Sequence, residues 1–259
     1  MKFKIKTIIV AIFLLVCGVV SANDLSLRIT NDGYVEAKIT LSNNGQDENR
    51  RRRLANIDAY RYIAEHIGDL QVTSESKVED FILKSDDIKL IIQKKISGLE
   101  IIDNYPDPVS DSWHSTVRLK IYGKNSLASA ILSEESTEVE DFLKPKFTPI
   151  IDKDYTGLIV DCRGWNLTPA IFPSIISEDD EMIYSYKNVK RNVAASNGLM
   201  GYSESVDSDV MRAGSKPLIV KALRTSDCDV VVSDEDKDKI LTANQTSKFL
   251  NNCMVVFVR

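Results

Sequence analysis

Residues able to do acid–base or metal chemistry are few in this sequence of 259 residues. It has two histidines, His66 and His114, and neither has a cysteine or a second histidine at the spacing that a zinc site needs. Cys162 could act as a nucleophile only beside a base, and the sequence supplies none near it. We therefore expect a protein that is not an enzyme and that has no catalytic residues, no bound metal and no cofactor.

Three cysteines, Cys162, Cys228 and Cys253, follow the N-terminal leader described below, so one disulfide could form and leave one thiol over. Cys228 and Cys253 each precede a strand of an expected strand–helix–strand unit. If those strands run parallel and adjacent, both sulfurs lie at the same edge of the sheet, which makes Cys228–Cys253 the candidate disulfide. Two buried, reduced cysteines are the favoured alternative.

Three charged runs could in principle bind ions, but each has a simpler interpretation. Consecutive positions of a helix point about 100° apart, so the Arg50–Arg53 run cannot form one flat phosphate-binding patch. The acidic run that starts at Asp234 has Lys239 and Gln245 where a calcium loop needs Gly and Glu. Acids in the first turn of a helix explain that run. Asp179–Glu181 is expected to be the tip of a turn.

The first 22 residues have the pattern of a secretory leader. Three lysines precede an apolar run, and Val20-Ser21-Ala22 offers the small residues that a signal peptidase reads. We predict cleavage between Ala22 and Asn23. The apolar stretch has 14 residues, short of the roughly 20 that span a bilayer, so a retained anchor is disfavoured. Lipidation at Cys17 is also disfavoured, because a bulky Val16 precedes it and no polar tether follows.

The net charge of the chain argues against some classes of binding partner. The whole chain carries 33 basic and 38 acidic residues; removing the three leader lysines leaves 30 against 38, a net charge of −8. An acidic exported chain gains nothing from the counterion release that drives nucleic-acid binding, and anionic lipid surfaces repel it. We expect a periplasmic or outer-membrane-associated protein that binds one or more envelope proteins, but neither nucleic acid nor lipid directly.

The residues after the leader predict an α+β first domain over residues 23–133. Leu25–Thr30 and Tyr34–Leu41 read as a hairpin around Asp32-Gly33. Strict alternation makes residues 111–122 a strand with one buried face, and it assigns His114 and Tyr122 to the exposed face. A helix from about Asp47 is expected to bury Leu54, Ile57, Tyr60, Ala64 and Ile67. We also expect a helix capped by Ser85, a strand at Leu99–Asp103 and a short helix at Leu127–Leu132.

Acids and prolines over residues 134–149 predict a solvated linker to a second α/β domain, residues 150–259. Each domain is expected to hold a mixed or antiparallel sheet with packed helices. A helix capped by Ser233 lies between strands at Asp229–Val232 and Met254–Val258, and this order predicts a parallel strand–helix–strand unit. Other strands are expected at Gly157–Asp161, Met182–Tyr186 and Leu218–Leu223.

Residues 33–122 also resemble known envelope domains. The stretch Arg52-Arg53-Leu54-Ala55-Asn56-Ile57-Asp58-Ala59-Tyr60-Arg61 is followed by Val72-Thr73-Ser74-Glu75-Ser76 and by Gly98-Leu99-Glu100-Ile101-Ile102. In this order and spacing, the segments resemble small bacterial surface lipoproteins of the Lpp-twenty type and the N-terminal domain of flagellar assembly protein T. The resemblance implies a non-catalytic α+β domain of the cell envelope. It transfers no site residues.

From these features we expect an exported envelope protein with a structural or assembly role, for which the resemblance implies a flagellar setting. The alternative is a periplasmic protein that binds a small ligand between its two halves. A deep cleft between the halves would favour the ligand-binding protein, and a flat apolar patch would favour the assembly protein.

Overall fold

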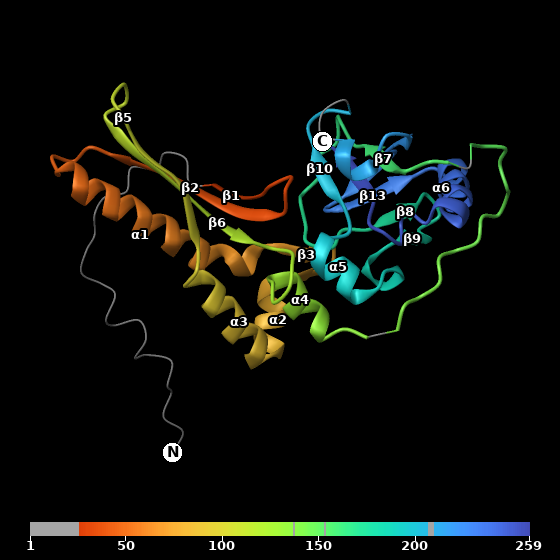
Figure 1. Ribbon diagram of the computed structural model, residues 1–259, viewed down its shortest axis with the longest axis horizontal. Helices are drawn as coiled ribbons and strands as arrows, with labels where there is room; N and C mark the ends of the chain where they lie inside the picture. Colours follow the sequence, from red (N-terminus) through yellow and green to blue (C-terminus); the bar gives the residue numbers. More distant parts are fainter. Residues whose placement is uncertain (1–25, 137, 153, 207–209) are drawn as a thin grey trace, which may run out of the picture.

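The computed structural model describes residues 26–136, 138–152, 154–206 and 210–259. The fold is α+β, as the sequence predicts, with helices, antiparallel pairs and parallel pairs of strands. Figure 1 shows the first half of the chain on the left and the second on the right, in contact near the centre. The predicted leader, its cleavage site at Ala22 and Asn23, and Cys17 lie outside the described residues.

One antiparallel sheet forms the first half. Its strand order is β1-β2-β6-β5, with bounds β1 (Ser26–Ile29), β2 (Tyr34–Ser42), β5 (Glu100–Asp107) and β6 (Ser112–Lys120). The predicted hairpin joins β1 to β2, and Gly33 takes a φ of 81° that its turn requires. Strand β5 forms one edge of this sheet and is paired on one side, with β6.

Helix α1 (Glu48–His66) packs on one face of this sheet, and Asp47 caps its N-terminus. The buried positions are Ala55, Ala59 and Ile63, whereas Ile57 is 51% exposed and Ala64 is exposed as well. The stripe predicted through Ile57 and Ala64 is therefore wrong. Small alanine side chains let the helix lie close to the strands, so the helix turns its alanines, and not its larger Ile57, toward the sheet.

Short elements close the first half: η2 (Ile67–Asp69), β3 (Gln71–Thr73), β4 (Ser76–Lys77), α2 (Val78–Lys84), α3 (Asp86–Ile96) and α4 (Leu127–Ser133). Ser85 caps α3 as predicted, through a bond from the amide of Ile88 to its hydroxyl. The alternation of β6 is confirmed for Trp113, Val117 and Leu119, all buried. Tyr122, expected on the exposed face, is buried instead, because the second half covers it.

The second half has two sheets of four strands. All neighbours in the order β10-β14-β7-β11 are parallel, whereas the order β12-β13-β8-β9 mixes both directions. The strands are β7 (Gly157–Asp161), β8 (Ile175–Ser177), β9 (Met182–Tyr184), β10 (Gly201–Ser203), β11 (Pro217–Lys221), β12 (Arg224–Ser226), β13 (Asp229–Val232) and β14 (Val255–Val258). Its helices are η3 (Tyr186–Asn188), α5 (Arg191–Asn197), η4 (Val210–Ala213) and α6 (Asp234–Ser247).

Helix α6 follows β13 and leads to β14, with Ser233 as its N-cap, as predicted. The two strands are not neighbours, however. Strand β13 pairs in parallel with β8, and β14 pairs in parallel with β7 and β10 of the other sheet. The prediction that these two strands are adjacent is therefore wrong. Each pairs instead with a strand from earlier in the chain, β13 with β8 and β14 with β7.

The described residues between positions 134 and 156 contain no helix or strand, and they run along the second half (Figure 1). This predicted linker is nevertheless attached. The amides of Lys146 and Phe147 donate to the Asp238 carboxylate at 2.8 and 3.0 Å, and the amide of Glu140 donates to Lys187 O at 2.9 Å.

Candidate functional site at the seam between the halves

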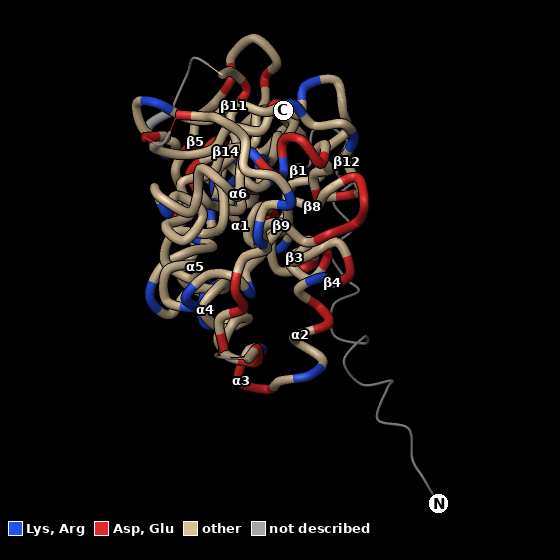
Figure 2. Tube along the Cα trace, turned by 90° about the vertical axis from the view of Figure 1, so that its right-hand side faces the viewer, with Lys and Arg blue, Asp and Glu red and all other residues tan. Residues whose placement is uncertain are grey.

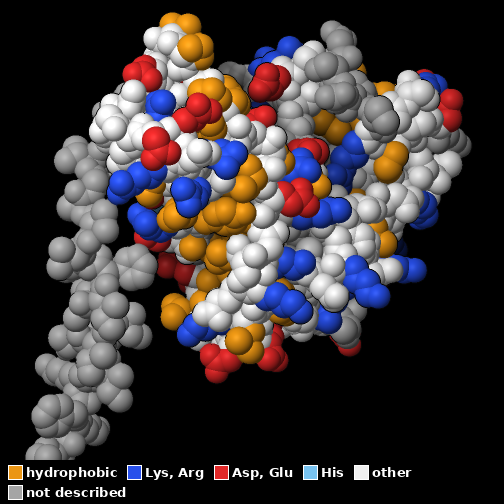
Figure 3. All heavy atoms as spheres, turned by 60° about the vertical axis from the view of Figure 1, so that its left-hand side comes forward, with side chains coloured by type: hydrophobic (Ala, Val, Ile, Leu, Met, Phe, Trp, Pro, Cys, Tyr) orange, Lys and Arg blue, Asp and Glu red, His pale blue; other side chains and the backbone are white. Residues whose placement is uncertain are grey.

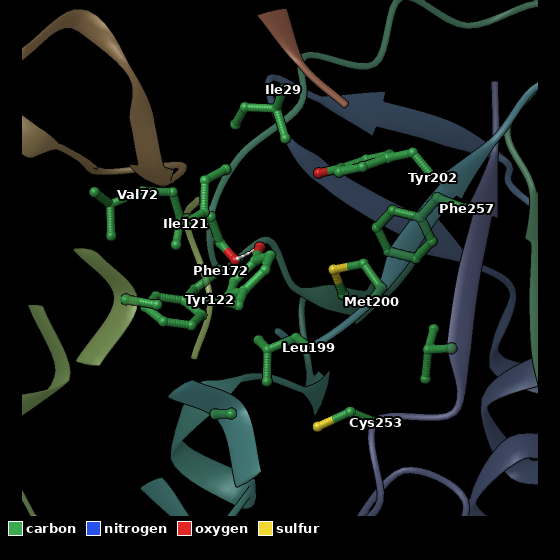
Figure 4. Packing of buried hydrophobic residues seen from close by; sticks show 14 of the residues in the cluster. Ile29, Val72, Ile121, Tyr122, Phe172, Leu199, Met200, Tyr202, Cys253 and Phe257 are labelled. Atoms are coloured by element: carbon green, nitrogen blue, oxygen red, sulfur yellow. Dashed lines mark hydrogen bonds between the residues drawn. The ribbon is translucent and has the colours of Figure 1, made fainter. Parts of the chain in front are cut away.

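Tyr122 lies at the seam between the two halves. Its hydroxyl donates to the carbonyl oxygen of Ile171 at 2.8 Å, and the next amide, Gly123 N, donates to Ala195 O at 2.8 Å. Figure 4 shows Tyr122 between Val72 and Ile121 of the first half and Leu199 and Met200 of the second. The buried hydrophobic residues of both halves belong to one continuous cluster.

Backbone pairing reinforces the seam. The amides of Ile171 and Phe172 donate to the carbonyl oxygens of Gln71 and Val72, at 3.0 and 2.7 Å. These two bonds tie a loop of the second half to strand β3 of the first. Helix α4 of the first half also packs against α5 of the second. The halves are thus joined by backbone hydrogen bonds as well as by side-chain packing.

Two glycines make room for the Tyr122 ring. A Cβ built at Gly33 would lie 2.7 Å from Tyr122 Cδ2, and one built at Gly198 would lie 2.6 Å from Cζ. Gly198 also has a φ of 70°, which side-chain-bearing residues rarely adopt. The structural role of Gly198 is to leave space for a ring from the other half.

A cavity of about 380 Å³ opens beside Tyr122. The first half lines one side of the cavity with the β1–β2 turn and Tyr122, and three segments of the second half line the other side. The first-half residues are Ile29, Thr30, Asn31, Asp32, Gly33 and Tyr122, and the second-half residues are Asn197, Met200, Tyr202, Arg212, Asn252, Cys253 and Met254. Its one guanidinium belongs to Arg212. The Nε of Arg212 donates to Cys253 O at 2.8 Å, and Nη2 donates to Gly198 O at 2.6 Å.

The phenols around this seam stay neutral. Burial raises the pKa of Tyr122, and the nearby Arg212 charge offsets part of that rise. Burial likewise raises the pKa of Tyr184 and of Tyr202. The hydroxyl of Tyr202 donates to Ala170 O at 3.2 Å, and that of Tyr184 donates to Leu199 O at 2.9 Å. All three phenols thus act as hydrogen-bond donors that fix backbone carbonyls.

The cysteines singled out by the sequence are buried, free thiols: Cys162, Cys228 and Cys253. Because β13 and β14 belong to different sheets, the adjacency proposed to bring the Cys228 and Cys253 sulfurs together is absent. Burial raises the pKa of Cys162 to about 12, and it raises the pKa of Cys228 and Cys253 as well. Raised pKa values disfavour the thiolate, the form that reacts.

The histidines make local contacts. His66 Nδ1 donates to Tyr62 O at 2.9 Å, one turn earlier in α1. His114 Nδ1 lies 3.0 Å from the Thr40 hydroxyl, and its Nε2 lies 3.6 Å from the carboxylate of Asp107. The two histidines lie on different elements and contact different partners.

The arginine run does not form a patch. Three of its four members are exposed, and Arg51 pairs with Asp111 at 3.2 Å. The interpretation as a solvated helix face therefore fits the structure.

The fold brings together two acidic runs that lie far apart in the sequence. Oxygens of Asp179, Glu181 and Asp234 lie within 4.8 Å of one another, on the side of the second half that carries β8 (Figure 2). The Lys237 ammonium, whose side chain is 1% exposed, contacts Glu181 and lies 2.6 Å from Asp234. Burial opposes the charge of Lys237, but its hydrogen bonds with Asp234 and Glu181 outweigh burial and raise its pKa. Lys237, together with Lys146 at 3.2 Å from Glu181, therefore offsets two of the three negative charges of this cluster.

Exposed apolar side chains gather on the first half, on and next to the edge strand β5. Ile101, Ile102 and Tyr105 of β5 are exposed, and Val109, in the turn to β6, is 94% exposed. Figure 3, which brings this end of the molecule forward, shows hydrophobic side chains on the same half. The strand predicted from the sequence ended at Asp103, so Tyr105 and Val109 fell outside it, whereas β5 continues to Asp107.

Residues 157–259 match the family described as the second domain of Treponema pallidum Tp0624. The match begins at the first residue of β7 and covers less than half of the chain. No curated protein matches the chain. The resemblance predicted over residues 33–122 lies outside this match and stays a prediction. Within the described residues, every helix falls short of the length and apolar character needed to cross a bilayer.

Proposed function

We propose that the protein is a non-catalytic, exported envelope protein that holds a protein partner through its first half, in a structural or assembly role. The observation that carries this proposal is the group of exposed apolar side chains on and beside β5, defined here as the β5 surface: Ile102, Tyr105 and Val109. Ile101 is excluded, because it pairs with Val117 on the face that packs against α1, whereas Tyr105 pairs with His114 on the opposite face. Contiguous exposed apolar patches on a protein surface often mark sites of contact with another protein. The flagellar ring is the setting that the sequence resemblance implies.

Contact by side chains is a better match to this surface than addition of a strand. An edge strand can template a new strand only where its amides are free and regular. Strand β5 has a bulge between Ile101 and Asp103, and Pro106 has no amide hydrogen. Both features weaken strand addition, whereas Ile102 and Tyr105 remain available to a partner.

The attachment of this surface to the rest of the molecule also supports the proposal. Strand β5 pairs with β6, and the Asn104 amide donates to Asn56 of α1 at 2.7 Å. Tyr60 of α1 donates to Leu99 O at 3.2 Å, just before β5. A surface fixed at two points loses little conformational entropy when a partner binds it.

The test uses exposed residues, since removing the first half would uncover the buried cluster that both halves share. The double variant Ile102→Ser with Tyr105→Ser should abolish the protein's role in envelope or flagellar assembly without changing its level or melting temperature. Leu83→Ser, at an 84% exposed position of α2, is the matched control and should retain function. Normal assembly in the double variant would refute the proposal.

The second candidate function is binding of a small ligand between the halves. The cavity of about 380 Å³ beside Tyr122 favours it, because its size falls within the range of ligand pockets. Direct titration of the purified protein with small molecules tests it. This function and partner binding use different surfaces, so either could stand without the other.

A further inference from the structure

We propose that the cavity between the halves takes a small anion, a carboxylate or a phosphate, and that Arg212 is the residue that recognises it. This inference rests on the second candidate function and names its ligand class. It arises from a guanidinium in a cavity wall whose charge the described protein leaves uncompensated.

Arg212 is held in place by neutral groups. Its Nε and Nη2 donate to the carbonyl oxygens of Cys253 and Gly198. Among the described residues, no carboxylate lies within ion-pair distance of the guanidinium, and its Nη1 has no acceptor. A Cβ at Gly201 would lie 3.2 Å from Arg212 Cδ, so the absence of a side chain at Gly201 leaves space for the arginine side chain. A positioned cation with a donor to spare is the usual requirement for binding carboxylate or phosphate oxygens.

The other polar groups of the cavity suit the same ligand. Asn31, from the β1–β2 turn, and Asn197, at the end of α5, line it and make no side-chain hydrogen bond to the described protein. Their amides can donate to further oxygens of an anion. Asn31 belongs to the first half and Asn197 to the second, so a ligand here would contact both halves.

One carboxylate, that of Asp32, also lines the cavity. Asp32 is exposed, and it accepts a hydrogen bond from the Thr30 hydroxyl at 2.6 Å. The negative charge of Asp32, at the exposed rim of the cavity, opposes anion binding, whereas the positive charge of Arg212 inside the cavity favours anion binding. Substitutions at the two residues should therefore change anion affinity in opposite directions.

The experiment is calorimetric titration of the purified protein with citrate and with pyrophosphate, and with glucose as a neutral probe, at matched ionic strength. At least one anion should bind. Arg212→Gln should weaken its binding about 10-fold or more, since a hydrogen bond to a charged group is lost. Asp32→Asn should tighten binding about 2-fold, as expected for removal of a like charge in a solvated setting.

Arg212→Gln also removes two bonds to the backbone, so its thermal unfolding is measured without ligand, and Asp32→Asn provides the independent test in a protein that keeps Arg212. An anion affinity unchanged in both variants would overturn the assignment to this cavity. Binding of glucose without either anion would refute the ligand class but leave ligand binding standing. Absence of binding by all three probes would refute both.

Discussion

The ring of Tyr122 occupies the space that a side chain at Gly198 would need. A Cβ at Gly198 would lie 2.6 Å from Tyr122 Cζ and 2.8 Å from both Cε atoms. Tyr122 lies two residues beyond the end of β6 in the first half, and Gly198 is the C-cap of α5 in the second. Because the contact is so close, the two halves can pack in this way only while residue 198 is glycine.

Gly198→Ala should therefore destabilise the protein strongly. Gly45→Ala is the matched control, since Gly45 also has a positive φ, of 74°, but a Cβ there would meet nothing within 4 Å. The control should lose about 1–2 kcal/mol from backbone strain alone. Gly198→Ala should lose a further 1–3 kcal/mol or so, from overpacking against Tyr122 and from added backbone strain, because its ψ of 165° lies outside the left-handed helical region. Urea unfolding measures both, and equal losses would contradict the interlocking of Tyr122 with Gly198.

The orientation of α1 gives a second matched pair. Ala59 is fully buried against the sheet, whereas Ile57 is half exposed. Ala59→Asp should unfold the protein, because an unpaired buried charge costs several kcal/mol out of a total of roughly 5–15. Ile57→Asp should change stability by about 0.5 kcal/mol or less. Circular dichroism melts distinguish the two, and unfolding by Ile57→Asp would restore the stripe predicted from the sequence.

Lys237 should make stability depend on pH in the acid range. Hydrogen bonds from Lys237 lower the pKa of Glu181 and of Asp234 below the ordinary 4.5 and 3.8. A lowered carboxyl pKa adds stability above its ordinary value, and that stability is lost as the pH falls through the folded-state value. Lys237→Met should therefore be less stable than wild type above pH 5, by a margin that narrows below about pH 4.

Unfolding in urea from pH 3 to pH 7 checks this dependence. Lys89→Met, an exposed change on α3, serves as the control and should follow the wild-type curve throughout. A constant gap between Lys237→Met and wild type over the whole range would show that the ion pairs do not cause it.

The three buried thiols should be unreactive in the folded protein. Because burial raises the pKa of Cys162 to about 12, its thiolate is scarce at pH 8, and access is blocked as well. Iodoacetamide should label Cys162, Cys228 and Cys253 slowly in buffer and rapidly in denaturant. Peptide mapping without reduction provides the counter-test, since a linked Cys228–Cys253 peptide would contradict the free thiols.

Local pattern predicted much of this fold. The turn at Gly33, the caps at Ser85 and Ser233, and the buried side of β6 all follow from rules that act over a few residues. Contacts between distant segments did not follow. Tyr122 matched the exposed alternation of its strand, and only packing against the second half buries it. Strand β14 pairs with β7, almost a hundred residues earlier in the chain, and periodicity carries no signal for such a pairing.

The candidate site likewise combines features that the local sequence predicts with contacts between distant segments that it does not predict. The sequence offered no reason to group Arg212 with Asn31, because the two residues meet only where the halves meet. The ion cluster around Lys237 was likewise visible only as two separate acidic runs. Sites built across a seam depend on how the domains pack, which short-range rules do not encode.

Site-specific photocrosslinking in living cells of the organism that encodes the protein tests the central claim most directly. A photoreactive amino acid replaces Tyr105 in one variant, Val109 in a second, and Leu83, an exposed residue of α2 that lies off the β5 surface, in a third. If the β5 surface holds a protein partner, positions 105 and 109 should give the same crosslinked product of fixed mass, and position 83 should not. No product from positions 105 and 109, or the same product from position 83, would contradict the proposed function.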